Sequence, residues 1–231
     1  MYDLPWKLVI FDNDGVVVDS EPLASVASSQ TLTALGHPMT PGECDQAFLG
    51  LSLPTTRRLV EERSGRALPA DFEDRYLARV ADLIASQLRP VPGIAAVLDI
   101  LDAVGLPYCM ASSSRRQLIS LALRTTGLAE RFAGHWWGAD DVALGKPAPD
   151  LFLLAAGSMG ARPQDCVVVE DSQAGVQAGR AAGMAVLGFA ARTPPELLRL
   201  ADRIFSDMAQ LPALLLGGES TLAQVVGDQG G

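Results

Sequence analysis

Two carboxylates two residues apart, Asp12 and Asp14, follow the apolar run from Leu8 to Phe11. Such a run predicts a buried β-strand, in which side chains two residues apart point to the same side. We therefore expect the strand to deliver both carboxylates together at its carboxyl end, with Gly15 permitting a sharp turn. Two carboxylates held this close repel each other, so they need a shared proton, a cation or a basic neighbour. The pattern fits a nucleophile and an acid/base group working beside a metal ion.

Three further polar segments follow predicted strands, which places them at the same edge of a parallel sheet. They are Ala111–Arg115 with the serines Ser112, Ser113 and Ser114, Gly145–Asp150 with Lys146, and Glu170–Gly175, which begins with Glu170 and Asp171. A hydroxyl and nearby N–H groups can hold phosphate oxygens, and a lysine can offset charge on phosphate and carboxylate. Four carboxylates call for a hard cation such as Mg²⁺. Ser114 is also expected to cap the helix that starts at Arg115.

These segments, together with Asp12-Asn13-Asp14-Gly15, resemble the four motifs of the haloacid dehalogenase superfamily of phosphotransferases. The motifs occur in order and the resemblance extends to about residue 215. It is closest to the branch with a helical cap inserted after the first motif, which includes sugar phosphatases and β-phosphoglucomutase. An isolated pair of aspartates would be weak evidence, whereas four motifs in register are specific.

The resemblance implies a role for each matching residue. Asp12 resembles the nucleophile, a carboxylate already ionised at pH 7 that forms an aspartyl phosphate, and Asp14 resembles the general acid/base. Ser112 and Lys146 resemble the groups that hold the phosphate and offset its charge. The implied cofactor is Mg²⁺. Its implied ligands are Asp12, the backbone carbonyl of Asp14, Asp171, and Glu170 either directly or through water.

Substrate binding is assigned to four residues by the same resemblance: Gly50, Ser52, Ser113 and Arg115. The segment around Gly50 and Ser52 matches a specificity loop, and Arg115 stands where the mutase has a phosphate-contacting lysine. Two positions depart from the mutase. Leu53 stands where the mutase has an arginine for a second phosphate, and Ala24 stands where it has a histidine. Both departures favour a phosphatase over a mutase.

The elements that must position these residues alternate between strand and helix from Pro90 onward. Strands are predicted at 108–111, 135–138, 166–170 and 185–189, and helices at 93–104, 115–126, 150–159 and 174–182. This alternation predicts an α/β fold with a doubly wound, Rossmann-like parallel sheet. Only helical patterns occur before it, at 21–36, 54–64 and 71–88. We therefore expect a core of residues 1–17 and 90–216, an inserted helical cap domain of 18–89 and a flexible Gly-rich tail of 217–231.

Composition excludes several classes of protein. The net charge of −9 and the pI of about 4.7 argue against a surface for nucleic acid or anionic membrane. The cysteines Cys44, Cys109 and Cys166 are far apart in apolar surroundings, which predicts buried, reduced thiols. Neither a membrane-spanning run nor a signal peptide is visible, so we expect a cytoplasmic monomer.

Other phosphate-binding folds match less well. The segment from Gly138 to Lys146 has the wrong spacing for a P-loop, and Pro147 stands where Ser or Thr would bind Mg²⁺. No G-x-G-x-x-G motif follows the first strand, and a receiver domain would lack the helical insert. The sequence therefore predicts a Mg²⁺-dependent phosphatase of small metabolites such as sugar or polyol phosphates. A phosphosugar mutase and a non-catalytic phosphate-binding relic remain the alternatives.

Overall fold

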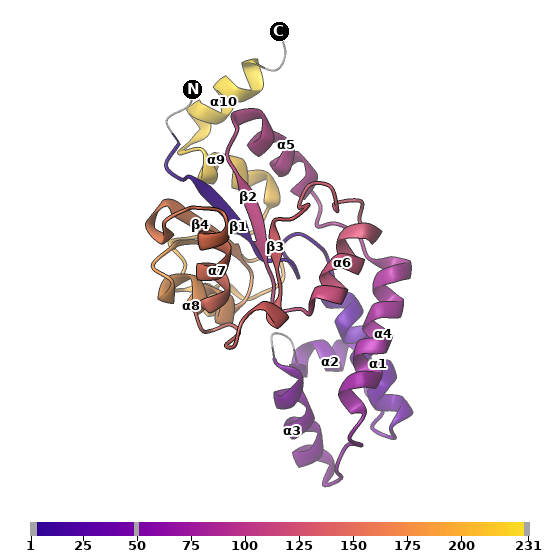
Figure 1. Ribbon diagram of the computed structural model, residues 1–231. Coiled ribbons are helices and arrows are strands. Elements are labelled where there is room, and N and C mark those ends of the chain that lie inside the picture. The colour runs from indigo at the N-terminus through magenta and orange to yellow at the C-terminus, as the bar shows by residue number, and fades with distance from the viewer. Residues whose placement is uncertain (1–3, 49–50, 229–231) are drawn as a thin grey trace.

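The centre of the molecule is a six-stranded parallel sheet in the order β3-β2-β1-β4-β5-β6 (Figure 1). This computed structural model describes residues 4–48 and 51–228. The strands are β1 (Leu8–Phe11), β2 (Tyr108–Ala111), β3 (Trp136–Trp137), β4 (Cys166–Glu170), β5 (Ala185–Phe189) and β6 (Arg203–Phe205). The strand order reverses between β1 and β4, and ligands bind beyond the carboxyl ends of strands at such a reversal. The predicted doubly wound α/β sheet is confirmed.

Helices cover both faces of this sheet. They are α5 (Ile94–Val104), α6 (Arg116–Thr125), α7 (Asp150–Ser158), α8 (Gln173–Ala181) and α9 (Leu211–Leu215). Val9 and Phe11 of β1 belong to the hydrophobic layer under α5, α6 and α9, whereas Leu8 and Ile10 belong to the layer under α7 and α8. Because β1 is buried on both faces, its sequence is a continuous apolar run rather than an alternating one.

Four helices form a separate group beyond the carboxyl edge of the sheet (Figure 1). They are α1 (Glu21–Ala34), α2 (Pro41–Phe48), α3 (Leu53–Ser64) and α4 (Phe72–Gln87), with their own buried cluster of Leu32, Cys44, Phe48, Val60, Leu68 and Phe72. The chain enters and leaves this group side by side, since the Asp19 N–H donates to the Arg89 carbonyl at 3.0 Å. That residues 18–89 act as an independent cap domain stays a prediction.

The predicted elements recur with ends shifted by a few residues, but α2, β6 and the short helix α9 were not predicted. Helix α2 buries only Cys44 and Phe48, so its apolar pattern is weak. A capping box was the available signal: Thr40 Oγ1 accepts from the Glu43 N–H at 3.2 Å, and Glu43 Oε2 accepts from the Thr40 N–H at 2.7 Å. Strand β6 is a three-residue edge strand, too short for a periodic signal.

The segment 217–231, expected to be a flexible tail, contains a helix that was not predicted, and its flexibility stays a prediction. Residues Glu219–Asp228 form helix α10, which packs against α5 and α9 at the end of the molecule away from α1–α4 (Figure 1). Val225 is buried, so this helix packs at least one apolar side chain against the rest of the molecule.

Two compositional expectations have structural counterparts. Cys44, Cys109 and Cys166 are buried and unpaired, as predicted. Within residues 4–48 and 51–228, no helix combines the length and the apolar character needed to cross a membrane.

Close packing of α8 on the sheet generates a stability prediction. A Cβ at Gly179 would lie 2.7 Å from Val186 Cγ2, whereas a Cβ at Gly157 of α7 would meet nothing within 4 Å. We expect Gly179→Ala to lower the free energy of unfolding by about 1–3 kcal/mol through overpacking. Gly157→Ala, the matched control, should raise it by about 0.5–1 kcal/mol by restricting the unfolded chain. Urea denaturation checks both, and equal effects at the two positions would contradict this packing.

Candidate active site

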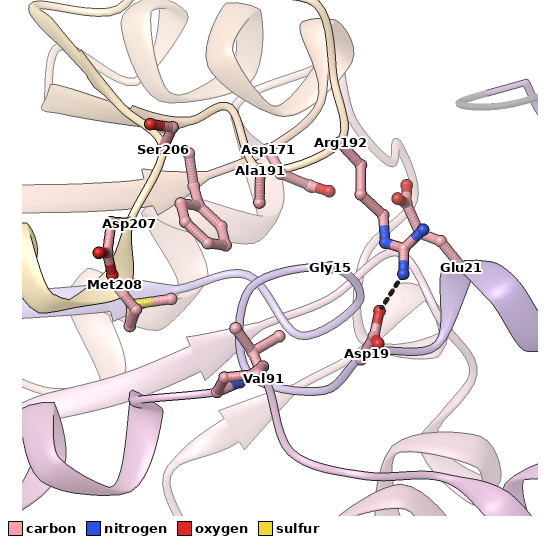
Figure 2. A pocket seen from close by; sticks show the side chains of 12 residues that line it. Gly15, Asp19, Glu21, Val91, Asp171, Ala191, Arg192, Ser206, Asp207 and Met208 are labelled. Atoms are coloured by element: carbon pink, nitrogen blue, oxygen red, sulfur yellow. Dashed lines mark ion pairs between the residues drawn. The ribbon is translucent and has the colours of Figure 1, made fainter.

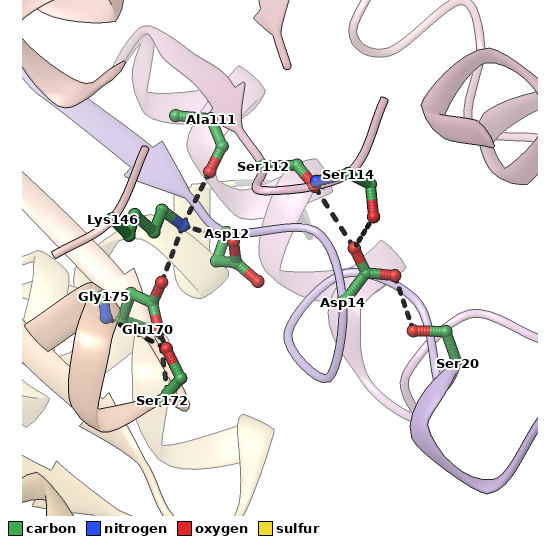
Figure 3. Close-up of polar contacts among 10 residues, drawn as sticks. All are labelled: Asp12, Asp14, Ser20, Ala111, Ser112, Ser114, Lys146, Glu170, Ser172 and Gly175. Carbon is green, nitrogen blue, oxygen red and sulfur yellow. Dashed lines mark hydrogen bonds and ion pairs between the residues drawn. The ribbon is translucent and has the colours of Figure 1, made fainter. Parts of the chain in front are cut away.

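Asp12 lies at the carboxyl end of β1, next to the end of β4. Its N–H donates to the Val169 carbonyl at 2.9 Å, which continues the pairing of the two strands past Phe11. Its side chain is directed toward Lys146, whose Nζ donates to Asp12 Oδ1 at 2.5 Å (Figure 3). Strand pairing therefore fixes the backbone of Asp12, and Lys146 orients its carboxylate.

Lys146 joins three strand ends through one ammonium group. Besides Asp12, its Nζ donates to Glu170 Oε1 at 2.7 Å and to the Ala111 carbonyl at 3.0 Å (Figure 3). Its side chain is 3% exposed. Burial lowers the pKa of Lys146, but the carboxylates of Asp12 and Glu170 outweigh burial and raise the pKa above its ordinary value. The ammonium therefore stays charged and ties β1, β2 and β4 together.

The buried carboxylates carry more negative charge than Lys146 offsets. Asp12, Glu170 and Asp171 are 6%, 1% and 6% exposed. Burial raises the pKa of Asp12 to about 8 against the opposing effect of Lys146, and Glu170 adds to the increase. Burial, then the charge of Glu170, also raises the pKa of Asp171 well above its ordinary value. Such a cluster favours either bound protons or a cation.

The oxygen atoms near Asp12 include those of carboxylates and carbonyls, the type of ligand that Mg²⁺ prefers. No three His, Cys, Asp or Glu side chains of the described residues converge as a ready metal cluster. The expected ligands include only two or three carboxylates and one backbone carbonyl, and Mg²⁺ usually completes its shell with water and substrate oxygens. Gly15 permits the close approach, because a Cβ on it would overlap with Asp171 Oδ2. Its φ of 82° also requires glycine.

Glu170 is oriented by the start of α8. Its Oε2 accepts from the N–H of Ser172 at 2.8 Å and from the Ser172 hydroxyl at 2.9 Å (Figure 3). The Ser172 Oγ also caps α8 by accepting from the Gly175 N–H at 3.0 Å. A Cβ at Gly175 would overlap with the Glu170 carboxylate. Both carboxylate oxygens of Glu170 therefore accept hydrogen bonds from the protein, Oε1 from Lys146 and Oε2 from Ser172. This arrangement is consistent with a role of Glu170 in orienting Lys146.

Asp14 is held by three serine hydroxyls. Its Oδ1 accepts from Ser20 Oγ at 2.7 Å, and its Oδ2 accepts from Ser114 Oγ at 2.8 Å and Ser112 Oγ at 3.2 Å (Figure 3). Sequence reasoning missed these roles of Ser20 and Ser114, because a serine before a helix is equally typical of a cap. The prediction that Ser114 caps α6 is wrong: Asp140 Oδ2 accepts from the first N–H of α6 at 2.8 Å instead.

One cavity borders these groups, and a second lies next to it. The larger one, of about 500 Å³, opens beside Gly15 and Asp171 (Figure 2). Its other lining residues are Asp19, Glu21, Val91, Pro92, Phe189, Ala191, Arg192, Ser206, Asp207 and Met208. The smaller one, of about 120 Å³, lies among the helices α1–α4. Its lining residues are Glu21, Ala24, Ser25, Ser28, Cys44, Phe48, Leu51, Leu53, Thr56 and Tyr76. The two cavities share Glu21.

Three of the four residues expected to bind substrate line neither of these cavities. Ser113 and Arg115 are exposed and line neither of the two. Ser52 caps α3, its Oγ accepting from the Thr55 N–H at 3.4 Å. Gly50 lies outside the described residues. The roles assigned to these four residues stay predictions.

Comparison with known proteins places this geometry in a family. The model of the haloacid dehalogenase-like hydrolases matches residues 6–183. A probable pseudouridine-5'-phosphatase from Drosophila melanogaster is 35% identical over 77% of this chain and 79% of its own length. The 6-phosphogluconate phosphatase of Escherichia coli is 30% identical over 90% of this chain and 94% of its own length.

A solved structure is similar throughout. A haloacid dehalogenase family hydrolase from Deinococcus radiodurans, determined with bound phosphate and sodium, superposes with a TM-score of 0.79. It is 32% identical, and the match covers 93% of this chain and 97% of that one.

The charge excess at Asp12 generates a prediction for metal and pH. The pKa of Asp12 is about 8 in the folded protein and 3.8 in the unfolded chain. Between pH 3.8 and about 8, the folded metal-free protein therefore binds one more proton than the unfolded chain. Its free energy of unfolding falls as pH rises through this range. Mg²⁺ must displace that proton. We therefore expect the half-saturating Mg²⁺ concentration for thermal stabilisation to fall about tenfold for each unit by which pH rises toward 8.

Thermal melts across a Mg²⁺ titration, at about pH 6, 7 and 8, test this expectation. Asp12→Asn removes the titrating carboxylate and should both weaken Mg²⁺ binding and flatten its pH dependence. Stabilisation by Mg²⁺ that is independent of pH in the wild-type protein would show that Asp12 does not take part.

Proposed function

The chain belongs to the haloacid dehalogenase-like hydrolase family, and we propose that it hydrolyses sugar or polyol phosphates through an aspartyl phosphate on Asp12. The family match and relatives at 30–35% identity, named as phosphatases of small phosphorylated metabolites, support a hydrolase acting on phosphate monoesters. The covalent step, the residue roles and the Mg²⁺ requirement are the finer parts of the proposal.

One observation carries the proposal: Lys146 contacts Asp12 Oδ1 while also contacting Glu170. An ammonium in this position holds the nucleophile in one orientation and offsets part of the charge that an approaching phosphate would meet. Because Lys146 contacts Oδ1, the other oxygen of Asp12 is the one available to attack phosphorus.

Asp14 is suited to move the proton in both half-reactions. As Asp12 attacks phosphorus and the bond to the ester oxygen breaks, Asp14 donates its proton to that oxygen, and the alcohol leaves. Asp14 then accepts a proton from water, whose oxygen attacks phosphorus and releases inorganic phosphate and the Asp12 carboxylate. The hydroxyls of Ser20 and Ser114 keep Asp14 in place for both steps.

Asp12, the carbonyl of Asp14, and Asp171 would hold Mg²⁺, with Glu170 acting through Lys146 or a bound water. When bound, Mg²⁺ would supply positive charge that lets an anionic phosphate approach the carboxylates. The shortage of positive charge around Asp12 and Asp171 supports this assignment.

A phosphosugar mutase of the same family is the main alternative. Leu53 and Ala24, at the two positions where the resemblance to the mutase breaks down, both line the small cavity. Neither side chain can bind a second phosphate or move a proton. These residues favour water as the acceptor of the phosphoryl group.

We expect wild-type protein with Mg²⁺ to release inorganic phosphate from p-nitrophenyl phosphate and from hexose phosphates. Asp12→Asn should lower the rate by at least about a thousandfold, because an amide is a poor nucleophile although nearly the same shape. Phosphate release is measured by a colorimetric assay, and circular dichroism establishes that the variant is folded.

The same reaction distinguishes hydrolase from mutase. β-Glucose 1-phosphate with a trace of its bisphosphate is incubated with the protein, and both phosphate and glucose 6-phosphate are followed. Formation of the isomer faster than phosphate would contradict the phosphatase assignment. No turnover of any ester would instead favour a phosphate-binding relic.

A further inference from the structure

Glu21 is a half-buried carboxylate that the reaction does not use. It is the first residue of α1 and lines both the larger and the smaller cavity. Its Oε2 is buried and has no hydrogen-bond partner among the described residues. Burial raises the pKa of Glu21 to about 7, although Arg192 opposes this effect. This one oxygen therefore lacks the hydrogen-bond partner that usually accompanies burial.

The position of Glu21 relates it to the leaving group. Asp14 protonates the ester oxygen in the proposed reaction, so the leaving group must extend from Asp14. Ser20, which donates to Asp14, directly precedes Glu21 in the chain. Tyr76 also lines the small cavity, and burial raises its pKa, to which the charge of Asp14 adds. A leaving group that extends from Asp14 toward α1 and α4 therefore meets Glu21 and then the small cavity.

The small cavity lacks a cation among the described residues. None of those that line it is Lys, Arg or His. Arg192, a lining residue of the larger cavity, pairs with Asp19 at 3.3 Å, and Figure 2 shows its guanidinium between Asp19 and Glu21. Arg57 on α3 donates instead to the carbonyls of Leu68 and Pro69. The main charges acting on Glu21 are those of Arg192 and of three carboxylates, Asp45, Asp14 and Asp19.

Hydroxyl groups supply the other polar contacts of the small cavity. Ser25 Oγ donates to Asp45 Oδ1 at 3.0 Å, and Ser28 and Tyr76 add two more hydroxyl-bearing side chains to the lining. The apolar side chains that line it include Phe48, Leu51 and Leu53. Within the part of the chain that the structure describes, the cavity therefore offers hydrogen bonds and apolar contact, but nothing that would compensate a negative charge.

We propose that Glu21 and the small cavity select phosphate esters with an uncharged, hydroxyl-rich leaving group, from which Glu21 accepts a hydrogen bond, and reject leaving groups that carry a carboxylate or a second phosphate. This inference rests on the proposed function. A substrate hydroxyl would satisfy the unpartnered Oε2, whereas the charge of Glu21 would repel an anion. Glu21 is thus a specificity-determining residue.

Two substrates that differ at one carbon test the inference. Glucitol 6-phosphate ends in CH₂OH where 6-phosphogluconate ends in a carboxylate. At about pH 8, where Glu21 is mostly ionised, we expect kcat/KM of the wild-type protein to favour glucitol 6-phosphate by at least about tenfold. Glu21→Gln removes the charge but keeps a hydrogen-bond acceptor, and should reduce that ratio by about threefold or more.

Glu62→Gln is the matched control. It removes the same charge from an exposed position of α3, where Glu62 pairs with Arg58, and should leave the substrate ratio unchanged. A wild-type ratio near one or in favour of 6-phosphogluconate overturns the inference, whether or not Glu21→Gln folds. So does an unchanged ratio in a Glu21→Gln protein whose circular dichroism is that of the wild type.

p-Nitrophenyl phosphate, which has no polyol, separates this inference from the proposed function. If the wild-type protein hydrolyses it but prefers 6-phosphogluconate, only the inference fails. If it hydrolyses neither the aryl nor the sugar esters, the proposed function fails and the inference with it.

Discussion

Buried negative charge at the centre of the sheet edge is the constraint on which the site depends. Asp12, Glu170 and Asp171 are withdrawn from water where β1 and β4 end, and one ammonium, that of Lys146, contacts two of them. Removing carboxylates from water is costly unless charge and hydrogen bonds compensate. The surrounding loops supply this compensation: Ser172 holds Glu170, and Lys146 reaches across three strand ends. The remaining deficit of positive charge favours the binding of a cation, and with it a phosphate.

The site has opposite electrostatic character at its two ends. At the sheet edge, Lys146 and the proposed Mg²⁺ attract the phosphate. Toward the helices α1–α4, Glu21 and Asp45 leave an excess of negative charge among hydroxyl and apolar groups. Asp14 lies between the two ends, held by serines from both the sheet side and the start of α1. In the proposed reaction, this polarity would orient a phosphate ester with its phosphorus at Asp12 and its leaving group toward the helices. That orientation would put the ester oxygen beside Asp14, the proposed acid.

The sequence predicted the sheet and the carboxylates at its edge because strands buried on both faces leave continuous apolar runs, as in β1 and β4. The sequence did not predict the contacts of Asp14, because Ser20 and Ser114 each precede a helix and such serines are typical helix caps. Only the fold brings both hydroxyls to Asp14. Glu21 was missed for a similar reason: an acidic residue in the first turn of a helix ordinarily lies in solvent and interacts favourably with the helix dipole. Helix α2 was detectable from Thr40 and Glu43, whereas α10 depends on tertiary contact at Val225.

Direct identification of the phosphoenzyme tests the central claim, that Asp12 is the nucleophile. The protein is mixed with Mg²⁺ and a hexose phosphate, quenched during turnover and reduced with borohydride, which converts an aspartyl phosphate to homoserine. Mass spectrometry of the peptides then locates the modification. We predict homoserine at residue 12 and nowhere else, dependent on substrate. Homoserine at another carboxylate, or phosphate release at full rate with no modified peptide at any quench time, would contradict the assignment of Asp12.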